Sequence, residues 1–253
     1  MSIELIRYSE RPELWSGTGE ISAEVWPEYN LHGDVLNSFW GRLPDEFPDY
    51  QFCLYDDRER EVLAEGHTAP CPWDGTPDGL GDGIDAMIGA AFEARHANQA
   101  PTALCALAAE IRPRFQGRGL AGLILDAMAG LARESEFAHL IAPVRPSYKD
   151  RYPITPIEGY VTWTRENGEP FDPWIRVHVR RGGVIVKPAP RSLRITGTVG
   201  EWEEWTAMRF PEDGAYTFPA GLAPLEIDHA RDLGAYWEPN VWIVHSVGEA
   251  ENS

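Results

Sequence analysis

The sequence predicts a mixed α/β fold within one domain of 253 residues, and three observations support this prediction. Segments with strand-like and helix-like spacing of apolar residues follow one another along the chain. One strand-like run, residues 102–111, leads through a short turn with two glycines directly into an amphipathic helix. Hydrophobic residues make up 43% of the chain, which is enough for a substantial core, and no linker-like stretch divides it.

The first hundred residues have the spacing of three strands and three helices. Apolar periodicity predicts helices over 12–26, 35–43 and 84–97. Strands are expected over 3–8, 50–55 and 62–70. The charged segment 56–60 separates the last two, so these strands are expected to form a β-hairpin.

Beyond the helix that starts at residue 120, β-prone segments outnumber helical ones. A strand is expected at 139–144, followed by a connection rich in proline and tyrosine over 146–159. Asp172 is a suitable N-cap and Pro173 a suitable first residue for a helix that stops at Gly182. The remaining strand predictions are 184–186, 192–198, 202–208 and 240–245.

Residues 116–121, Gln-Gly-Arg-Gly-Leu-Ala, have the features of an anion pocket. The first N–H groups of a helix have no intrahelical partner and carry the positive end of the helix dipole, so they attract phosphate. Gly117 and Gly119 lack a Cβ and allow close approach, and Arg118 adds a charged fork of donors. The turn therefore predicts a phosphate-containing ligand.

The pattern Gln-x-x-Gly-x-Ala, preceded by Ile111 and Pro113, resembles the pyrophosphate loop of the GNAT superfamily of acyl-CoA-dependent N-acyltransferases. The resemblance implies an α/β (α+β) fold with a mixed, mostly antiparallel central sheet, splayed fourth and fifth strands and helices on both faces. Within a single domain of residues 1–253, the resemblance covers a core at 3–208 with a helical insertion at 71–98. Residues 209–253 are then expected to form a β-rich C-terminal extension.

The resemblance also implies the reaction and its co-substrate. Acetyl-CoA, or another acyl-CoA, would donate its acyl group to the amine of a small molecule by direct attack in a ternary complex, without a metal. The matching positions that would bind the co-substrate are Ile111, Gln116, Gly117, Arg118, Gly119, Ala121 and Gly122.

The resemblance implies catalytic residues at only some of the positions where the family has them. His178 stands four residues before Gly182, where the family often has a tyrosine that protonates the leaving thiolate, and a histidine of near-neutral pKa suits that role. Cys105 stands where several members have a glutamate base. Glu110 is the nearest carboxylate, although strict strand alternation places it on the opposite face from Cys105. The other candidates for the base are a water chain, Glu28, or Asp34 with His32 between them.

Charge and composition restrict the partners. Lys and Arg total 22 against 40 Asp and Glu, and the net charge of −18 disfavours nucleic acid and anionic membranes. Three dispersed cysteines predict neither a disulfide framework nor a zinc site. The sequence shows no signal peptide and no membrane span, so we expect a cytoplasmic protein with a small amine substrate. The insertion and the extension are natural places for a substrate pocket or a homodimer contact.

Two alternatives remain at this stage. Because Cys105 replaces a catalytic carboxylate, the chain could instead be a non-catalytic acyl-CoA sensor or partner protein. Ten tryptophans would also suit an acyltransferase for longer or aromatic acyl groups. Arg145 and Lys149 could meet a substrate carboxylate or a CoA phosphate, or could lie in a solvated loop.

Overall fold

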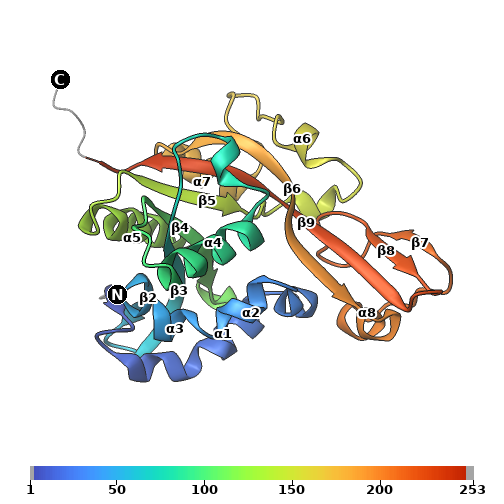
Figure 1. The fold of residues 1–253 in the computed structure, drawn as a ribbon, viewed down its shortest axis with the longest axis horizontal. Coiled ribbons are helices and arrows are strands. Elements are labelled where there is room, and N and C mark those ends of the chain that lie inside the picture. The colour runs from blue at the N-terminus through green and yellow to red at the C-terminus, as the bar shows by residue number, and fades with distance from the viewer. Residues whose placement is uncertain (1–2, 249–253) are drawn as a thin grey trace.

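A nine-stranded sheet forms the centre of the protein in a computed structural model that describes residues 3–248 (Figure 1). Neighbouring strands follow the order β1-β2-β3-β4-β5-β9-β8-β7, and β6 also pairs with β9. The strands are β1 (Ile3–Arg7), β2 (Gln51–Asp56), β3 (Glu61–Cys71), β4 (Ala103–Ile111), β5 (His139–Val144), β6 (Val184–Gly197), β7 (Gly214–Tyr216), β8 (Leu225–Asp228) and β9 (Leu233–Ser246).

Helices cover both faces of this sheet. They are α1 (Thr18–Val25), α2 (Leu36–Trp40), α3 (Leu43–Glu46), α4 (Ile84–His96), α5 (Leu120–Glu134), α6 (Ile157–Tyr160), α7 (Pro173–Arg180) and α8 (Val199–Thr206). Short 3-10 turns, among them η1 (Pro12–Gly17) and η2 (Glu28–His32), connect the first elements. The α/β fold, the hairpin of β2 and β3, and the helices at 84–96 and 120–134 are thus confirmed.

The fourth and fifth strands diverge, as the resemblance implies. They run parallel, and their register consists of Leu104 opposite Leu140 and Cys105 opposite Ile141. Strands β1 to β4 pair antiparallel with one another in chain order. Strand β5 pairs antiparallel with β9 from His139 to Val144. The C-terminal half of β4, as far as Ile111, therefore has an open edge toward β5.

The C-terminal strand lies inside the sheet. β9 lies between β5 and β6 and forms registered pairs with both, from Val184 opposite Val244 to Gly197 opposite Gly234. Figure 1 shows β6 and β9 running side by side toward a lobe built from α8, β7 and β8. The expected β-rich extension from residue 209 onward thus includes β9, which shares one ladder with β6 of the core.

Two main layers of apolar side chains build the core. On one face, α5 places Leu120, Ile124 and Leu131 against Leu104 of β4 and Leu140 of β5. On the other face, α2 and α4 pack with the side of β4 that carries Cys105. A third cluster joins α6 and α7 to β5 and β9. The helical insertion before β4 thus supplies α4, a regular layer of the core.

The helix α7 begins where the sequence predicts. The Asp172 carboxylate accepts hydrogen bonds from the backbone N–H groups of Trp174 and Ile175, and Pro173 occupies the first turn. The second Asp172 oxygen accepts from the Tyr160 hydroxyl and from the Tyr148 N–H. This buried network fixes the position of α7 against the connection that precedes it.

The strand predicted at 202–208 is wrong, because residues 199–206 form the helix α8. Thr198 caps the helix by accepting from the Glu201 N–H, and the Glu201 side chain accepts from the Thr198 N–H. Val199, Trp202 and Thr206 are buried, which is helical rather than alternating spacing. The signal Thr-x-x-Glu was present in the sequence, but the β-prone tryptophans outweighed it.

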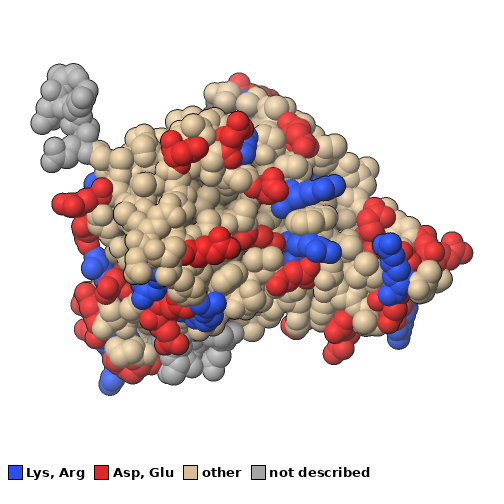
Figure 2. Space-filling view, in the orientation of Figure 1, with Lys and Arg blue, Asp and Glu red and all other residues tan. Residues whose placement is uncertain are grey.

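Charged side chains of both signs lie on the surface of the protein. Figure 2 shows acidic side chains spread over the visible face and mixed with Lys and Arg, without a continuous basic patch on that face. Among residues 3–248, no helix has the length and apolar character needed to cross a membrane.

We expect Thr198→Ala to lower the free energy of unfolding by about 1 kcal/mol, because it removes one side of the capping box. Thr198→Ser keeps the hydroxyl and should stay close to the parent protein. Urea denaturation followed by circular dichroism measures both. Equal stability of Thr198→Ala and the parent would contradict a stabilising cap.

Candidate active site

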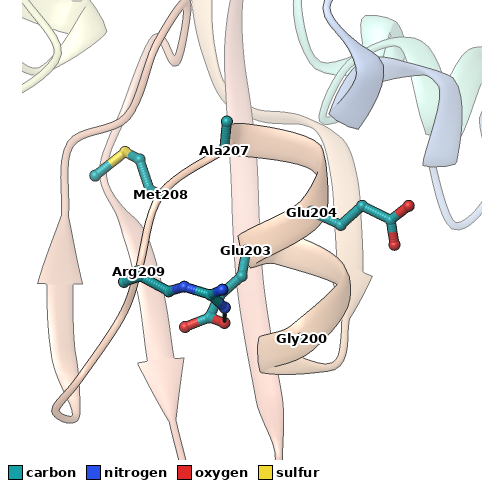
Figure 3. A pocket seen from close by; sticks show the side chains of 6 residues that line it. All are labelled: Gly200, Glu203, Glu204, Ala207, Met208 and Arg209. Atoms are coloured by element: carbon teal, nitrogen blue, oxygen red, sulfur yellow. Dashed lines mark hydrogen bonds and ion pairs between the residues drawn. The ribbon is translucent and has the colours of Figure 1, made fainter.

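A cavity of about 1070 Å³ opens where β4 and β5 diverge. The glycine turn before α5 lines it, and so do Arg145, Glu238 and Asn240. Glu110 and His178 also line the cavity. A smaller hollow of about 360 Å³ lies at the end of α8, where Arg209 and Glu203 form an ion pair (Figure 3). The large cavity is therefore the candidate active site.

The glycine turn has the geometry of an anion pocket. Gly117 and Gly119 have φ angles of 75° and 84°, and a Cβ built on either would meet no heavy atom within 4 Å. Within the described residues, none of the backbone N–H groups from 117 to 121 donates an intramolecular hydrogen bond. The Gln116 amide donates to the Ile111 carbonyl at 3.2 Å, which ties the turn to β4. Open space and free donors at a helix N-terminus fit a diphosphate.

Two of the predicted loop residues have different surroundings. Arg118 is exposed and its guanidinium lies 5.2 Å from the centre of the Phe115 ring. Gly122 is buried, and its N–H donates to the Gly119 carbonyl at 3.1 Å. A Cβ at Gly122 would overlap the Arg181 guanidinium, which pairs with Asp126. The glycine at 122 therefore allows α5 to pack against the end of α7, and its N–H is not available to a phosphate.

A β-bulge at Leu107 corrects the expected direction of Glu110. Thr68 lies opposite Ala106 whereas His67 lies opposite Ala108, so Leu107 is an extra residue on β4. On one side of the bulge Ala69 lies opposite Cys105, and on the other side Glu65 lies opposite Glu110. Residues 65 and 69 share one face of β3, which has no extra residue there. Glu110 therefore lies on the same face as Cys105, and the prediction from strict alternation is wrong.

The Glu110 carboxylate is buried in the cavity wall and held by two donors. The Ser22 hydroxyl donates to Oε2 at 2.9 Å, and the indole Nε1 of Trp26 donates to Oε1 at 2.6 Å. Burial raises the pKa of Glu110 above its ordinary value of 4.5, while His67 and Trp26 oppose part of that rise. A carboxyl group whose pKa is raised toward the working pH is better suited to accept and release a proton.

A second buried layer supports Glu110. Glu65, His67 and Glu110 bring one ligand-type atom each to within 4.8 Å of one another. The Tyr8 hydroxyl donates to Glu65 at 2.5 Å, and His67 Nδ1 lies 3.2 Å from the Gln51 side-chain oxygen. Burial disfavours the charged imidazole, but Glu65 and Glu110 outweigh it, so the pKa of His67 is raised. This cluster was not predicted, although the spacing Glu65-x-His67 on a strand places both side chains on one face.

His178 lies on the opposite face of the sheet from Glu110. It belongs to α7, which packs with α5. Glu110 instead contacts Ser22 of α1 and Trp26, which follows α1 directly. The Nδ1 of His178 lies 2.9 Å from Nε2 of His245, and its ring packs 4.4 Å from the Trp174 ring. Burial, reinforced by His245 and Arg181, lowers the pKa of His178 to about 3. The expectation of a near-neutral pKa was therefore wrong, because His178 is neutral at physiological pH.

The hydrogen-bond chain favours one position for the proton of His178. The backbone of Arg181 opposes part of the burial that lowers the pKa of His245, as expected if His245 donates to the Arg181 carbonyl. Its Nε2 already faces His178, so the donor to Arg181 is Nδ1. A neutral His245 then accepts at Nε2 from Nδ1–H of His178. This leaves Nε2 of His178, which has no hydrogen-bond partner among the described residues, as an acceptor.

The other candidates for a base lie outside the cavity. Glu28 pairs with His32 at 3.0 Å, and the His32 ring stacks on Trp205. Asp34 accepts from the backbone N–H and hydroxyl of Thr196. None of these three lines the cavity.

Cys105 is also unsuited to act as a base. It is buried beside Cys71, and burial raises the pKa of its thiol well above the ordinary value. A thiol that stays protonated in this position serves the core.

Neither Arg145 nor Lys149 is a solvated loop residue. Lys149 is buried and its Nζ donates to the carbonyls of Leu222 and Tyr152 at 2.6 and 2.7 Å. Burial lowers the pKa of Lys149 to about 8. Arg145 forms an ion pair with Glu238 in the cavity wall.

Comparison with known proteins supports the family suggested by this geometry. The chain is 30% identical to "Arginine N-acetyltransferase avaD" from Aspergillus versicolor over 253 residues, covering 89% of this chain and 86% of the relative. The chain belongs to the GNAT superfamily. No protein-family model matches it.

Solved GNAT structures share the architecture. The loading GNATL domain of CurA from Lyngbya majuscula has a TM-score of 0.63 at 16% identity, covering 98% of each chain. The GphF GNAT-like decarboxylase in complex with isobutyryl-CoA has a TM-score of 0.58 at 15% identity, covering 98% of this chain and 100% of the other. The predicted GNAT membership and fold class are thus confirmed, and the enzyme is N-acetyltransferase-like.

We expect the neutral His178 ring of this GNAT enzyme to carry its proton on Nδ1. Nitrogen-15 NMR of the histidine side chains should show an unprotonated Nε2 that does not titrate between pH 8 and about 5, because burial disfavours the charged ring. His178→Gln assigns the signal. A titration midpoint near 6.5, or a proton on Nε2, would contradict the hydrogen-bond chain.

Proposed function

We propose that this GNAT enzyme transfers an acetyl group from acetyl-CoA to the amine of a small molecule, and that arginine is the first acceptor to test. The observation that carries the proposal is a single cavity that joins the glycine turn to Glu110 across the divergence of β4 and β5. The arginine N-acetyltransferase relative supports the choice of acceptor. We also propose that the protein acts in the cytoplasm as one domain.

The glycine turn and the open edge of β4 are the proposed co-substrate site. The N–H groups at Gly119 and Ala121 would bind the diphosphate, and the unpaired backbone near Ile111 would bind the pantetheine arm. Bound acyl-CoA supplies the thioester, whose carbon–sulfur bond breaks as the carbon–nitrogen bond forms, the sulfur taking one amine proton. Arg118, at the exposed rim, would add charge to the phosphates.

Glu110 is the proposed general base. The acceptor enters as an ammonium ion, and one proton must leave its nitrogen before that nitrogen can attack. Glu110 takes this proton, and its raised pKa brings it closer to that of the ammonium ion than an ordinary carboxyl would be. The interaction with His67 behind it opposes part of the rise in the pKa of Glu110 and so favours the ionised carboxylate.

His178 is proposed to position the reactants. A neutral ring with its proton directed to His245 does not protonate a thiolate, which replaces the general-acid role expected from the sequence. Its Nε2 would instead accept a hydrogen bond from a bound reactant on the face of the sheet opposite Glu110. The second amine proton can pass directly to the sulfur, so no separate acid is required.

Glu110→Gln should lower kcat by about 10² to 10⁴ while the affinity for acetyl-CoA stays within about twofold, because the amide cannot accept the proton. Steady-state kinetics and calorimetry measure the two quantities. In the parent enzyme, kcat/KM should fall as the pH decreases through the pKa of Glu110. Ser22→Ala removes a hydrogen bond that favours the carboxylate, so this acid limb should move to higher pH. An unshifted limb would argue against Glu110 as the titrating base.

Gly119→Ala should weaken acetyl-CoA and free CoA binding by about tenfold or more, because a methyl group would enter the phosphate pocket at a positive φ. Gly130→Ala is the matched control, since a Cβ there meets only the tip of Arg133 at 3.9 Å. Arg118→Ala should weaken binding less. Calorimetric titration measures all three variants. Wild-type affinity in Gly119→Ala would remove the phosphate assignment.

The same assays separate the alternatives. Saturable binding of acetyl-CoA without turnover on a broad amine panel would favour an acyl-CoA sensor. Tighter binding and faster turnover with a longer acyl-CoA would favour a different acyl donor.

A further inference from the structure

The end of the cavity beyond Glu110 contains a buried ion pair that acyl transfer does not use. Arg145 follows β5, and Glu238 comes from β9. The Arg145 Nε donates to Glu238 Oε1 at 2.9 Å, with side-chain exposures of 21% and 2%. This pair lies on the same side of the sheet as Glu110, because Trp26 contacts both sites: its Nε1 donates to Glu110 and its ring lies 5.9 Å from the Arg145 guanidinium.

Four hydrogen bonds hold this pair in a fixed position. Arg145 Nη2 donates to the Tyr29 hydroxyl at 3.1 Å and to the Ala220 carbonyl at 3.0 Å. Glu238 also accepts from the Asn30 amide and the Tyr236 hydroxyl, each at 3.3 Å. Burial opposes the charged guanidinium, but Glu238 outweighs it, so the pKa of Arg145 is raised and the charge is permanent.

One arm of the guanidinium is left for a ligand. Nε and Nη2 are occupied, whereas Nη1 forms no hydrogen bond within residues 3–248, and Arg145 lines the cavity. A buried ion pair usually contributes little net stability, because desolvation of both charges offsets their attraction. A fixed cation with a free donor in a cavity wall is therefore better explained by binding an anion than by folding.

We propose that Arg145 binds the carboxylate of an α-amino acid acceptor through Nη1, so that the enzyme acetylates amino acids in preference to simple amines. The inference rests on the proposed function. One indole, Trp26, contacts both Glu110 and Arg145, so the two sites are neighbours in the cavity wall. An α-amino acid carries its amine and its carboxylate on one carbon, which suits an amine placed beside Glu110 and a carboxylate directed to Arg145. Glu238 is a positioning residue that holds the guanidinium.

The acidic character of the protein strengthens this interpretation. A net charge of −18 repels anions in general, so a carboxylate needs a specific cation to remain in the cavity. The competing ligand for Arg145 is a CoA phosphate, which would make the same contact. These two possibilities differ in which binding event a change at Arg145 weakens.

The test compares amino acids with their decarboxylated counterparts: L-arginine with agmatine, L-lysine with cadaverine and L-tryptophan with tryptamine. L-arginine methyl ester removes the charge but keeps the carbon skeleton. We expect kcat/KM for L-arginine to exceed the values for agmatine and the ester by about tenfold or more, the contribution of a charge-assisted pair. The difference should appear mainly in KM.

Arg145→Gln/Glu238→Gln is the informative variant, because it removes both buried charges together and leaves neither unpaired. In this variant the ratio of kcat/KM for L-arginine to kcat/KM for agmatine should fall toward one, while CoA affinity stays near the parent value. Arg58→Gln, at the exposed tip of the β2–β3 hairpin, is the control and should keep the preference. Thermal unfolding of both variants establishes that they are folded.

Each outcome tests either the carboxylate site at Arg145 or the proposed transferase function. Equal kcat/KM for every acid and its decarboxylated amine would overturn the carboxylate site and leave the transferase intact. Weaker CoA binding in the double variant, with the acceptor preference unchanged, would assign Arg145 to a phosphate. If no amine is acetylated, the proposed function fails. Calorimetry of L-arginine, its ester and agmatine in the presence of CoA then still tests the site, because tighter binding of L-arginine that is lost in the double variant would support it and equal binding would overturn it.

Discussion

The uneven pairing of β5 is the constraint on which the rest of the structure depends. β9 pairs with β5 from His139 to Val144, whereas β4 pairs with it at only two positions. The apolar stripe of α5 packs against both strands and holds them together at Leu104 and Leu140. Beyond that point no further registered pair joins the two strands within residues 3–248, and the cavity opens there. The open edge of β4, the glycine turn and the two groups of polar residues all follow from this divergence.

The polar groups around the cavity reduce stability and have to be held by other contacts. Glu65, His67 and Glu110 lie in one buried cluster, and Arg145 with Glu238 forms another. A core of the same shape made from apolar residues would avoid the desolvation of these charges. Their hydrogen bonds to hydroxyl, indole and backbone groups compensate for only part of this cost. Such concentrations of buried charge are typical of sites where function determines the residue.

Much of the fold could be predicted, because its signals are local. The hairpin, the helix after the glycine turn and the N-cap at Asp172 each depend on residues close in sequence. The position of β9 could not be predicted, since a strand between β5 and β6 is specified by contacts across the whole chain. The tryptophans of α8 favoured a strand in isolation, and burial of Trp202 against Gly234 stabilises a helix instead.

The candidate residues could be selected from the sequence, but their arrangement could not. The glycine turn, Glu110 and His178 all line the cavity, while a single extra residue at Leu107 reversed the direction expected for Glu110. A bulge leaves no certain mark in a run of alanines and leucines. The pKa of His178 also depends on His245, which is distant in sequence. Burial and partner choice, which decide the chemistry of each group, are properties of the folded chain.

The position of β9 also has a consequence for how the chain reaches this structure. β5 ends at Val144 and its principal partner begins at Leu233, so about 90 residues must be ordered or looped out before the ladder can close. Such non-local pairing slows folding. Before β9 pairs with it, β5 exposes the whole edge that β9 later covers. The part of its other edge that β4 does not contact is also unpaired. Such unpaired strand edges are templates for association with another chain. The divergence that creates the cavity therefore also leaves β5 with unpaired edges during folding, and these edges can pair with another chain.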